Sequence, residues 1–161
     1  MAMTEVTVRA MNPDEFDRWQ DELAAGYARE HVTAGNWTPE EALDRAREAT
    51  AGFLPQGMAT PGMLFLVGEL ADGSPVGRLW IGLTHPRGLA DCAFLYDIEV
   101  AAGHRGRGLG RALLAAGERA AREHGAQALE LNVFGANETA RKLYETSGYR
   151  VVTQQMRKDL S

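Results

Sequence analysis

Three glycines spaced two residues apart lie between two segments of different hydrophobic pattern. The loop reads His104-Arg105-Gly106-Arg107-Gly108-Leu109-Gly110. Aromatic and β-branched residues at 94–100 indicate a strand, whereas Ala and Leu recurring every three or four positions over 109–123 predict a helix. Glycines at such a junction let backbone N–H groups approach a ligand at the positive end of the helix dipole. Residues 106–111 are therefore predicted to form an anion cradle, with phosphate as the usual anion.

The loop differs from the common nucleotide-binding motifs. No Gly-x-x-x-x-Gly-Lys-Ser/Thr occurs in the chain, so a nucleoside-triphosphate P-loop is not supported. Gly106-x-Gly108-x-Gly110 is not Gly-x-Gly-x-x-Gly, and no acidic residue ends a following strand about 20 residues on. A nicotinamide cofactor is therefore not indicated either.

Arg105, Gly108 and Gly110 match Gln/Arg-x-x-Gly-x-Gly/Ala, a pattern that resembles the acyl-CoA motif of the GNAT superfamily of N-acetyltransferases. Residues 137–149 are similar to a second signature of that family, Asn-x-x-Ala-x-x-Leu-Tyr followed by Gly-Phe/Tyr. Both motifs occur in the expected order. The resemblance implies an acetyl-CoA-dependent N-acetyltransferase that moves an acetyl group to a primary amine of a small molecule or peptide by direct attack.

The resemblance also implies which residues hold the cosubstrate. The backbone of the strand before the loop, at Ile98, Glu99 and Val100, would hold the pantetheine arm and polarise the thioester carbonyl. Tyr144 would donate a proton to the leaving thiolate, because its ordinary pKa of about 10 lies a little above that of a thiol. The expected cofactor-binding residues are Ile98, Val100, Arg105, Gly106, Arg107, Gly108, Leu109, Gly110, Arg111, Asn137 and Tyr144.

The general base is the least determined part of the expected site. An alkylamine with a pKa of about 10 is only about one part in a thousand unprotonated at pH 7, so its deprotonation matters. Glu99 is the first candidate and Asp97, acting through a water, the second. Strand side chains alternate, so Asp97 and Glu99 share one face and Tyr96 lies on the other unless a bulge intervenes. Ion pairing of both carboxylates with nearby Arg is the alternative.

Aromatic and metal-ligating residue types give no independent site. Trp19, Tyr27, Trp37 and Trp80 could line an acceptor pocket, although aromatics at helical and strand spacing are more often core residues. The four histidines show no metal-ligand spacing, so no metal is expected. The single cysteine, Cys92, has no partner for an internal disulfide and is interpreted as a small strand residue.

The order of predicted elements gives the fold class. A strand at 4–11 precedes a helix that begins at Asn12-Pro13-Asp14-Glu15, and a second helix begins at 38–41 and ends before Pro55. Strands follow at 62–70, 76–83 and about 90–100, then the helix at 109–123, a strand at 129–134, a helix at 137–148 and a strand at 149–158. The order βααβββαβαβ predicts one α+β domain over residues 1–161. Its mixed, mostly antiparallel sheet would have helices on both faces and be splayed at the strands before and after the glycine-loop helix.

Composition limits the partners. The net charge of −5 argues against nucleic acid, and no apolar run reaches the length of a membrane span. The N-terminus lacks a basic region and an apolar run, so a cytoplasmic protein is expected. Residues 13–55 carry ten acidic and four basic side chains, whereas 104–122 carry five Arg and one Glu. An anionic cofactor at one place and a cationic substrate at another would suit this asymmetry, and two solvated acidic helix faces would also produce it.

The sequence is consistent with three hypotheses about function. The expected partners of an enzyme are acetyl-CoA and an amine acceptor of unknown identity, with a homodimer as an option. A catalytically silent acyl-CoA sensor or interaction module with the same fold is the alternative from a different class. Phosphate binding of another kind is the third, and the first helices that would select the acceptor carry no recognisable motif.

Overall fold

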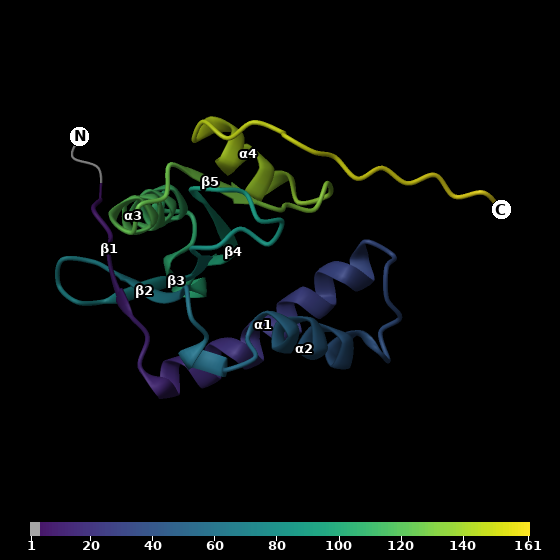
Figure 1. Ribbon diagram of the computed structural model, residues 1–161, viewed down its shortest axis with the longest axis horizontal. Coiled ribbons are helices and arrows are strands. Elements are labelled where there is room, and N and C mark those ends of the chain that lie inside the picture. The colour runs from purple at the N-terminus through teal and green to yellow at the C-terminus, as the bar shows by residue number, and fades with distance from the viewer. Residues whose placement is uncertain (1–3) are drawn as a thin grey trace.

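The computed structural model describes residues 4–161, which form a five-stranded sheet with helices on both faces (Figure 1). The sheet order is β1-β2-β3-β4-β5; pairs are antiparallel except β4 with β5, which is parallel. The α+β class and the mixed, mostly antiparallel sheet are thereby confirmed. The elements are β1 (Thr7–Ala10), α1 (Pro13–Thr33), α2 (Ala42–Phe53), β2 (Met63–Glu69), β3 (Pro75–Gly82), β4 (Cys92–Val100), α3 (Leu109–Glu123), β5 (Ala128–Leu131) and α4 (Glu138–Thr146).

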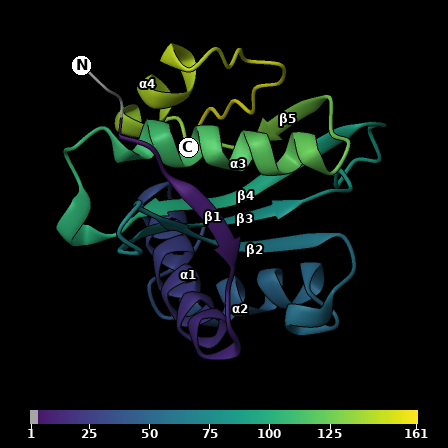
Figure 2. The same cartoon turned by 90° about the vertical axis from the view of Figure 1, so that its left-hand side faces the viewer.

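The two faces of the sheet are covered by different helices. α3 packs its apolar stripe against one face, where Leu113 and Leu114 are fully buried with Leu79 and Ile81 of β3. α1 packs on the opposite face through Phe16 and Trp19, and Figure 2 shows α1 and α3 on opposite sides of the strands. Within residues 4–161, no helix is long and apolar enough to cross a membrane.

The predicted helix starts differ in their outcome. Asn12 caps α1 as expected: its side chain accepts from the Glu15 N–H, and the Glu15 carboxylate accepts from the Asn12 N–H, both within 2.9 Å. The second helix was expected to begin at 38–41, but it begins at Ala42. Residues 39–41 form a turn instead, and the N-cap residue Glu41 makes no side-chain cap. Phe53, expected to point inward, is 44% exposed at the last position of α2.

A bulge in β4 decides which side chains face α1. Trp80 of β3 pairs with Asp97 and the next residue, Ile81, pairs with Leu95, so Tyr96 is an extra residue. Leu95 and Ile98 consequently both contact the α3 core, while Tyr96 packs with the α1 core. Asp97 also turns toward α1, because its carboxylate accepts from the Trp19 indole. The bulge that would place Tyr96 and Asp97 on one face is therefore present.

The end of the chain corrects the expected strand order. β5 spans 128–131 rather than 129–134, and residues 149–158, predicted to close the sheet, form no strand. The tail runs extended past α4 and away from the sheet (Figure 1), with Val151 and Met156 63% and 89% exposed. Its Arg157 guanidinium donates to the Ala34 carbonyl and the Asn36 side chain at the end of α1. Residues 149–158 pair with no strand although β5 is an edge strand of the sheet, so the prediction is wrong because β-propensity alone does not specify strand pairing.

Two paired glycines let α3 approach the sheet. Gly68 of β2 and Gly77 of β3 lie opposite each other under Leu113. A Cβ at Gly77 would lie 2.6 Å from the Glu99 carbonyl oxygen and 2.6 Å from Leu113 Cδ2. The carbonyl belongs to the sheet backbone and cannot move aside, so the close approach of α3 depends on the missing Cβ.

We expect Gly77→Ala to lower the free energy of unfolding by about 1–3 kcal/mol, since overpacking forces backbone shifts. Urea denaturation measures the change. The control is Gly52→Ala in α2, where a Cβ would meet nothing within 4 Å. That variant should be neutral or more stable by about 0.5–1 kcal/mol. A Gly77→Ala protein as stable as wild type would show that the contact with Leu113 is not tight.

Candidate active site

The loop between β4 and α3 presents free backbone donors. Gly106 and Gly108 have φ angles of +78° and +73°, a left-handed region that favours glycine, and a Cβ at either would meet nothing within 4 Å. Gly108 is the N-cap of α3 and supplies no side-chain acceptor to the first turn. No side chain of these two residues therefore obstructs the positive end of α3, as close approach of an anion to the backbone requires.

The parallel strands β4 and β5 part beside this loop. They pair only from Cys92–Ala128 to Leu95–Leu131, although β4 continues to Val100. The Ala101 N–H bonds to Val76 of β3, and the Val100 carbonyl on the other side accepts from Arg105. Because backbone groups alternate along a strand, Ile98 and Val100 turn their N–H and C=O toward the gap left by β5. Glu99 turns its backbone toward β3.

Arg105 lies across this gap. Its Nε donates to the Val100 carbonyl at 3.3 Å, and its Nη2 lies 2.8 Å from Glu99 Oε1. The other predicted Arg residues lie elsewhere: Arg111 donates to Thr146 and Ser147 at the end of α4, which ties α3 to α4. Arg107 is exposed on the loop. Of the three, Arg105 is the one held over the open edge of β4.

Arg78 of β3 joins the carboxylates on the α1 face of the sheet. Its side chain is 12% exposed and pairs with Asp97 Oδ2 at 3.1 Å, with Glu99 Oε2 at 2.6 Å and with Glu22 of α1. Asp97 Oδ2 also accepts from Trp19 Nε1 at 2.9 Å. Burial raises the pKa of the Asp97 carboxyl, against the opposing effect of Arg78. Both oxygens of Glu99 are thus bound by guanidinium groups, and Asp97 is buried within hydrogen bonds.

Tyr144 approaches the gap from the opposite side, on α4. Asn137 caps α4 by accepting from the Ala140 N–H at 3.1 Å, so its side chain serves the helix start. A Cβ on Gly110 would lie 3.5 Å from Leu143, which places α4 beside the first turn of α3. Burial and the charges of Asp97 and Glu30 raise the pKa of Tyr144 to about 12. The phenol therefore carries its proton at neutral pH.

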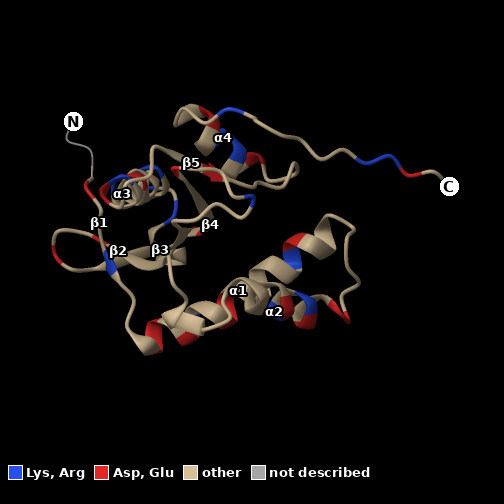
Figure 3. Ribbon diagram, in the orientation of Figure 1, with Lys and Arg blue, Asp and Glu red and all other residues tan. Residues whose placement is uncertain are grey.

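Glu30 is a member of this group that the sequence analysis missed. It lies near the C-terminal end of α1, and burial, then the charges of Asp97 and Glu99, raise the pKa of its carboxyl. The residue is exposed, and among residues 4–161 its carboxylate has no ion pair, unlike that of Glu22 on the same helix. An unpaired Glu in an amphipathic helix is indistinguishable by sequence from a solvated one. The charge density of 13–55 was the available signal, and Figure 3 shows acidic positions recurring along α1 and α2.

Four aromatic rings gather near the C-terminal end of α1: Tyr27, His31, Trp37 and Phe134. His31 stacks on Trp37 at 3.9 Å between centroids, and Phe134, in the segment after β5, meets His31 edge-on at 5.1 Å. Arg157 donates to Asn36 Oδ1, so the Asn36 amide turns its NH₂ toward His31 Nδ1 at 2.9 Å. His31 Nδ1 is then an acceptor and the buried, unpartnered Nε2 carries the proton. Trp19 and Trp80, by contrast, are core residues.

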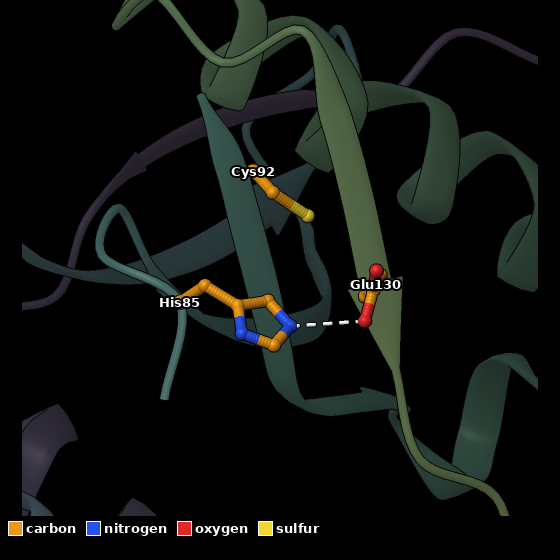
Figure 4. Close-up of side chains that lie close together, drawn as sticks. All are labelled: His85, Cys92 and Glu130. Carbon is orange, nitrogen blue, oxygen red and sulfur yellow. Dashed lines mark hydrogen bonds and ion pairs between the residues drawn. The ribbon is translucent and has the colours of Figure 1, made fainter. Parts of the chain in front are cut away.

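A second polar cluster lies at the closed end of the β4–β5 pair. His85, Cys92 and Glu130 bring possible ligand atoms within 4.8 Å of one another (Figure 4), although their sequence spacing gave no metal signal. His85 Nδ1 accepts from the Arg87 N–H at 3.0 Å, so Nε2 carries the proton and donates to Glu130 at 2.9 Å. In this tautomer His85 has no lone pair for a cation. The cluster is a hydrogen-bonded brace between the β3–β4 loop and β5.

Comparison with known proteins agrees with this geometry. The profile of the acetyltransferase (GNAT) family matches residues 16–149. The chain is 36% identical to the uncharacterized N-acetyltransferase YycN of Bacillus subtilis over 96% of this chain and 99% of that one, and the YycN crystal structure superposes with a TM-score of 0.89. A mycothiol acetyltransferase of Beutenbergia cavernae is 34% identical over 76% of this chain but 37% of its own length. The PaiA N-acetyltransferase of Thermoplasma acidophilum, solved with coenzyme A, shares the fold at 18% identity, with a TM-score of 0.65 over 94% of this chain and 93% of that one. The chain therefore belongs to the acetyltransferase (GNAT) family and is an N-acetyltransferase.

Proposed function

We propose that the protein transfers an acetyl group from acetyl-CoA directly to a cationic primary amine. One observation carries the proposal: the unpaired edge of β4 lies between an anion cradle on one side and a group of carboxylates on the other. Acetyl-CoA bound along that edge would have its phosphates at α3 and its thioester carbonyl near the group of carboxylates. The amine would approach from α1.

The residues on the open edge fit acetyl-CoA. The N–H groups of 106–111 would bind the pyrophosphate, and the backbone of Ile98 and Val100 would hydrogen-bond the pantetheine arm as an added strand does. Arg105 now occupies the Val100 carbonyl, so binding requires it to swing away, and a phosphate is a stronger partner for its guanidinium than a carbonyl. Glu99 would lose one of its two ion pairs, the one that Oε1 makes with Arg105, in the same movement and would keep the pair of Oε2 with Arg78.

The chemistry assigned to Tyr144 follows from its surroundings. Attack of the amine nitrogen on the thioester carbonyl forms the C–N bond, and the C–S bond breaks to release a thiolate. The Tyr144 phenol, protonated at neutral pH because its pKa is about 12, donates its proton to the sulfur. Direct attack needs no acyl-enzyme, and burial raises the pKa of the Cys92 thiol, which disfavours it as a nucleophile.

Gly110→Glu should lose at least tenfold in acetyl-CoA affinity, because a carboxylate would stand at the first turn of α3 where the pyrophosphate binds. Calorimetric titration with acetyl-CoA measures the affinity. The matched control is Gly110→Ala, whose methyl would make ordinary contacts with Leu143 and Val100 at 3.5 and 3.8 Å and should leave the protein folded. If a folded Gly110→Glu protein binds acetyl-CoA as wild type does, the cradle is misassigned.

Tyr144→Phe tests whether the phenol is the proton donor to the leaving sulfur. The ring and its packing on Tyr149 at 5.8 Å between centroids are kept, but the donor is lost. Loss of an interaction made in the transition state appears in kcat, so we expect kcat to fall roughly 10- to 1000-fold with little change in the KM for acetyl-CoA. Thiol release is measured with spermidine, kanamycin, tyramine and a short peptide as acceptors. An unchanged kcat where chemistry limits the rate would assign the proton to another donor, and wild-type binding without turnover of any amine would favour the sensor.

A further inference from the structure

We infer that Glu30 is the carboxylate that binds the acceptor's ammonium group and removes its proton. The inference rests on the proposed function. It names the general base of the reaction and explains why the acceptor would be a cationic amine. It comes from three observations: the helix face on which Glu30 lies, the absence of a cationic partner for it among the described residues, and the engagement of the competing bases.

The geometry begins with one face of α1. Trp19, Glu22, Gly26 and Glu30 are three or four residues apart and so lie along one side of the helix. Trp19 and Glu22 contact Asp97 and Arg78, which shows that this side faces the carboxylates of the sheet. Glu30 continues the same side, and its pKa responds to the charges of Asp97 and Glu99.

Gly26 leaves room for a substrate between Glu22 and Glu30. A Cβ at this position would meet nothing within 4 Å except the end of the Arg29 side chain at 3.8 Å. Tyr144 lies on α4, and its pKa is raised by burial and then by the charges of Asp97 and Glu30, which agrees with a phenol on the same side as these carboxylates. An amine held at Gly26 would therefore have a carboxylate on the α1 side and the phenol on the α4 side.

The other candidate general bases already have hydrogen-bond or ion-pair partners. Glu99 Oε2 is paired with Arg78, a contact that does not depend on Arg105, and Asp97 Oδ2 accepts from both Trp19 and Arg78. His31 carries its proton on Nε2, so its free ring nitrogen is a donor, and burial lowers its pKa. Glu30 has no guanidinium partner among the described residues, and Tyr27 lies three residues before it on α1, so the Tyr27 ring would cover the alkyl part of an amine.

With Glu30 as the base and Tyr144 as the acid, every proton in the reaction is accounted for. The ammonium gives one proton to Glu30, and the neutral nitrogen forms the C–N bond with the thioester carbonyl carbon. The C–S bond then breaks with the electron pair on sulfur, which takes the Tyr144 proton. The second proton lost by nitrogen returns to the Tyr144 oxygen through solvent, and Glu30 releases the first to solvent. The products are the acetamide, the free thiol and one proton.

The pKa of Glu30 sets the pH dependence. The groups that face it are Asp97 and Glu99 from β4, Tyr144 from α4, and Tyr27 and Arg29 on α1; burial and the two β4 carboxylates raise the pKa above the ordinary value of about 4.3, and Arg29 opposes them. The base form is lost as the pH falls through this raised pKa, so the acidic limb of kcat/KM belongs to Glu30. A carboxyl with a raised folded-state pKa also contributes stability that is lost as the pH rises. Glu30 therefore destabilises the neutral-pH protein.

The test is Glu30→Gln beside Glu48→Gln, an exposed Glu on α2 that loses the same charge. With the best alkylamine of the four acceptors named above, kcat/KM at pH 7 should fall 10- to 1000-fold and the acidic limb should disappear. Acetylation of an aniline, whose nitrogen is unprotonated at pH 7, should change less than threefold, and acetyl-CoA affinity should be unchanged. The Tm at pH 7 should rise, whereas loss of a merely structural residue would lower it.

Equal losses with the alkylamine and the aniline, or a lowered Tm with reduced acetyl-CoA affinity, would overturn the assignment of Glu30. So would a Glu30→Gln protein as active as Glu48→Gln. If the wild-type protein binds acetyl-CoA but acetylates none of the amines, the proposed function fails as well. If the wild type is active and the Glu30→Gln variant is equally active, only the assignment of Glu30 fails.

Discussion

The parting of β4 from β5 after Leu95 and Leu131 is the constraint on which the site depends. Parallel neighbours that separate leave one strand with unpaired N–H and C=O groups, and such groups bind either water or an extended ligand. The bulge at Tyr96 then turns Asp97 toward α1 while Ile98 and Val100 stay on the α3 side. Under the proposed function, the first feature provides an edge of β4 for the cosubstrate and the second provides a face for the acceptor. The brace of His85 and Glu130 ties the strands at the end where they still pair.

Basic and acidic side chains are separated in the same way as the edge and the face of β4. Basic residues lie on the loop and first turn of α3, acidic residues along α1, and Arg78 between them binds three carboxylates at once. A buried carboxylate is costly unless it is paired, so Arg78 permits Asp97 and Glu99 to be present near one another. Glu30 is exposed and has no such partner among the described residues, so an ammonium group can reach it from solvent.

Local patterns carried most of the prediction. The capping box at Asn12 and the strand–glycine–helix order depend on neighbours in sequence, and the structure contains both. The missing strand at 149–158 and the late start of α2 depend on pairing and capping that a pattern does not specify. The surroundings of Glu30, His85 and Glu130 come from strands and helices that are far apart in the chain. Their roles therefore cannot be predicted from the sequence pattern alone.

Amide hydrogen–deuterium exchange with and without acetyl-CoA tests the central claim, that the cosubstrate lies along the open edge of β4. The account predicts slower exchange at Ile98 and Val100 and across 106–111 when acetyl-CoA is saturating, with amides in the closed β4–β5 pair at 128–131 unchanged. Unchanged exchange at 98–111, or slowing confined to the end of the sheet that holds His85 and Cys92, would contradict it.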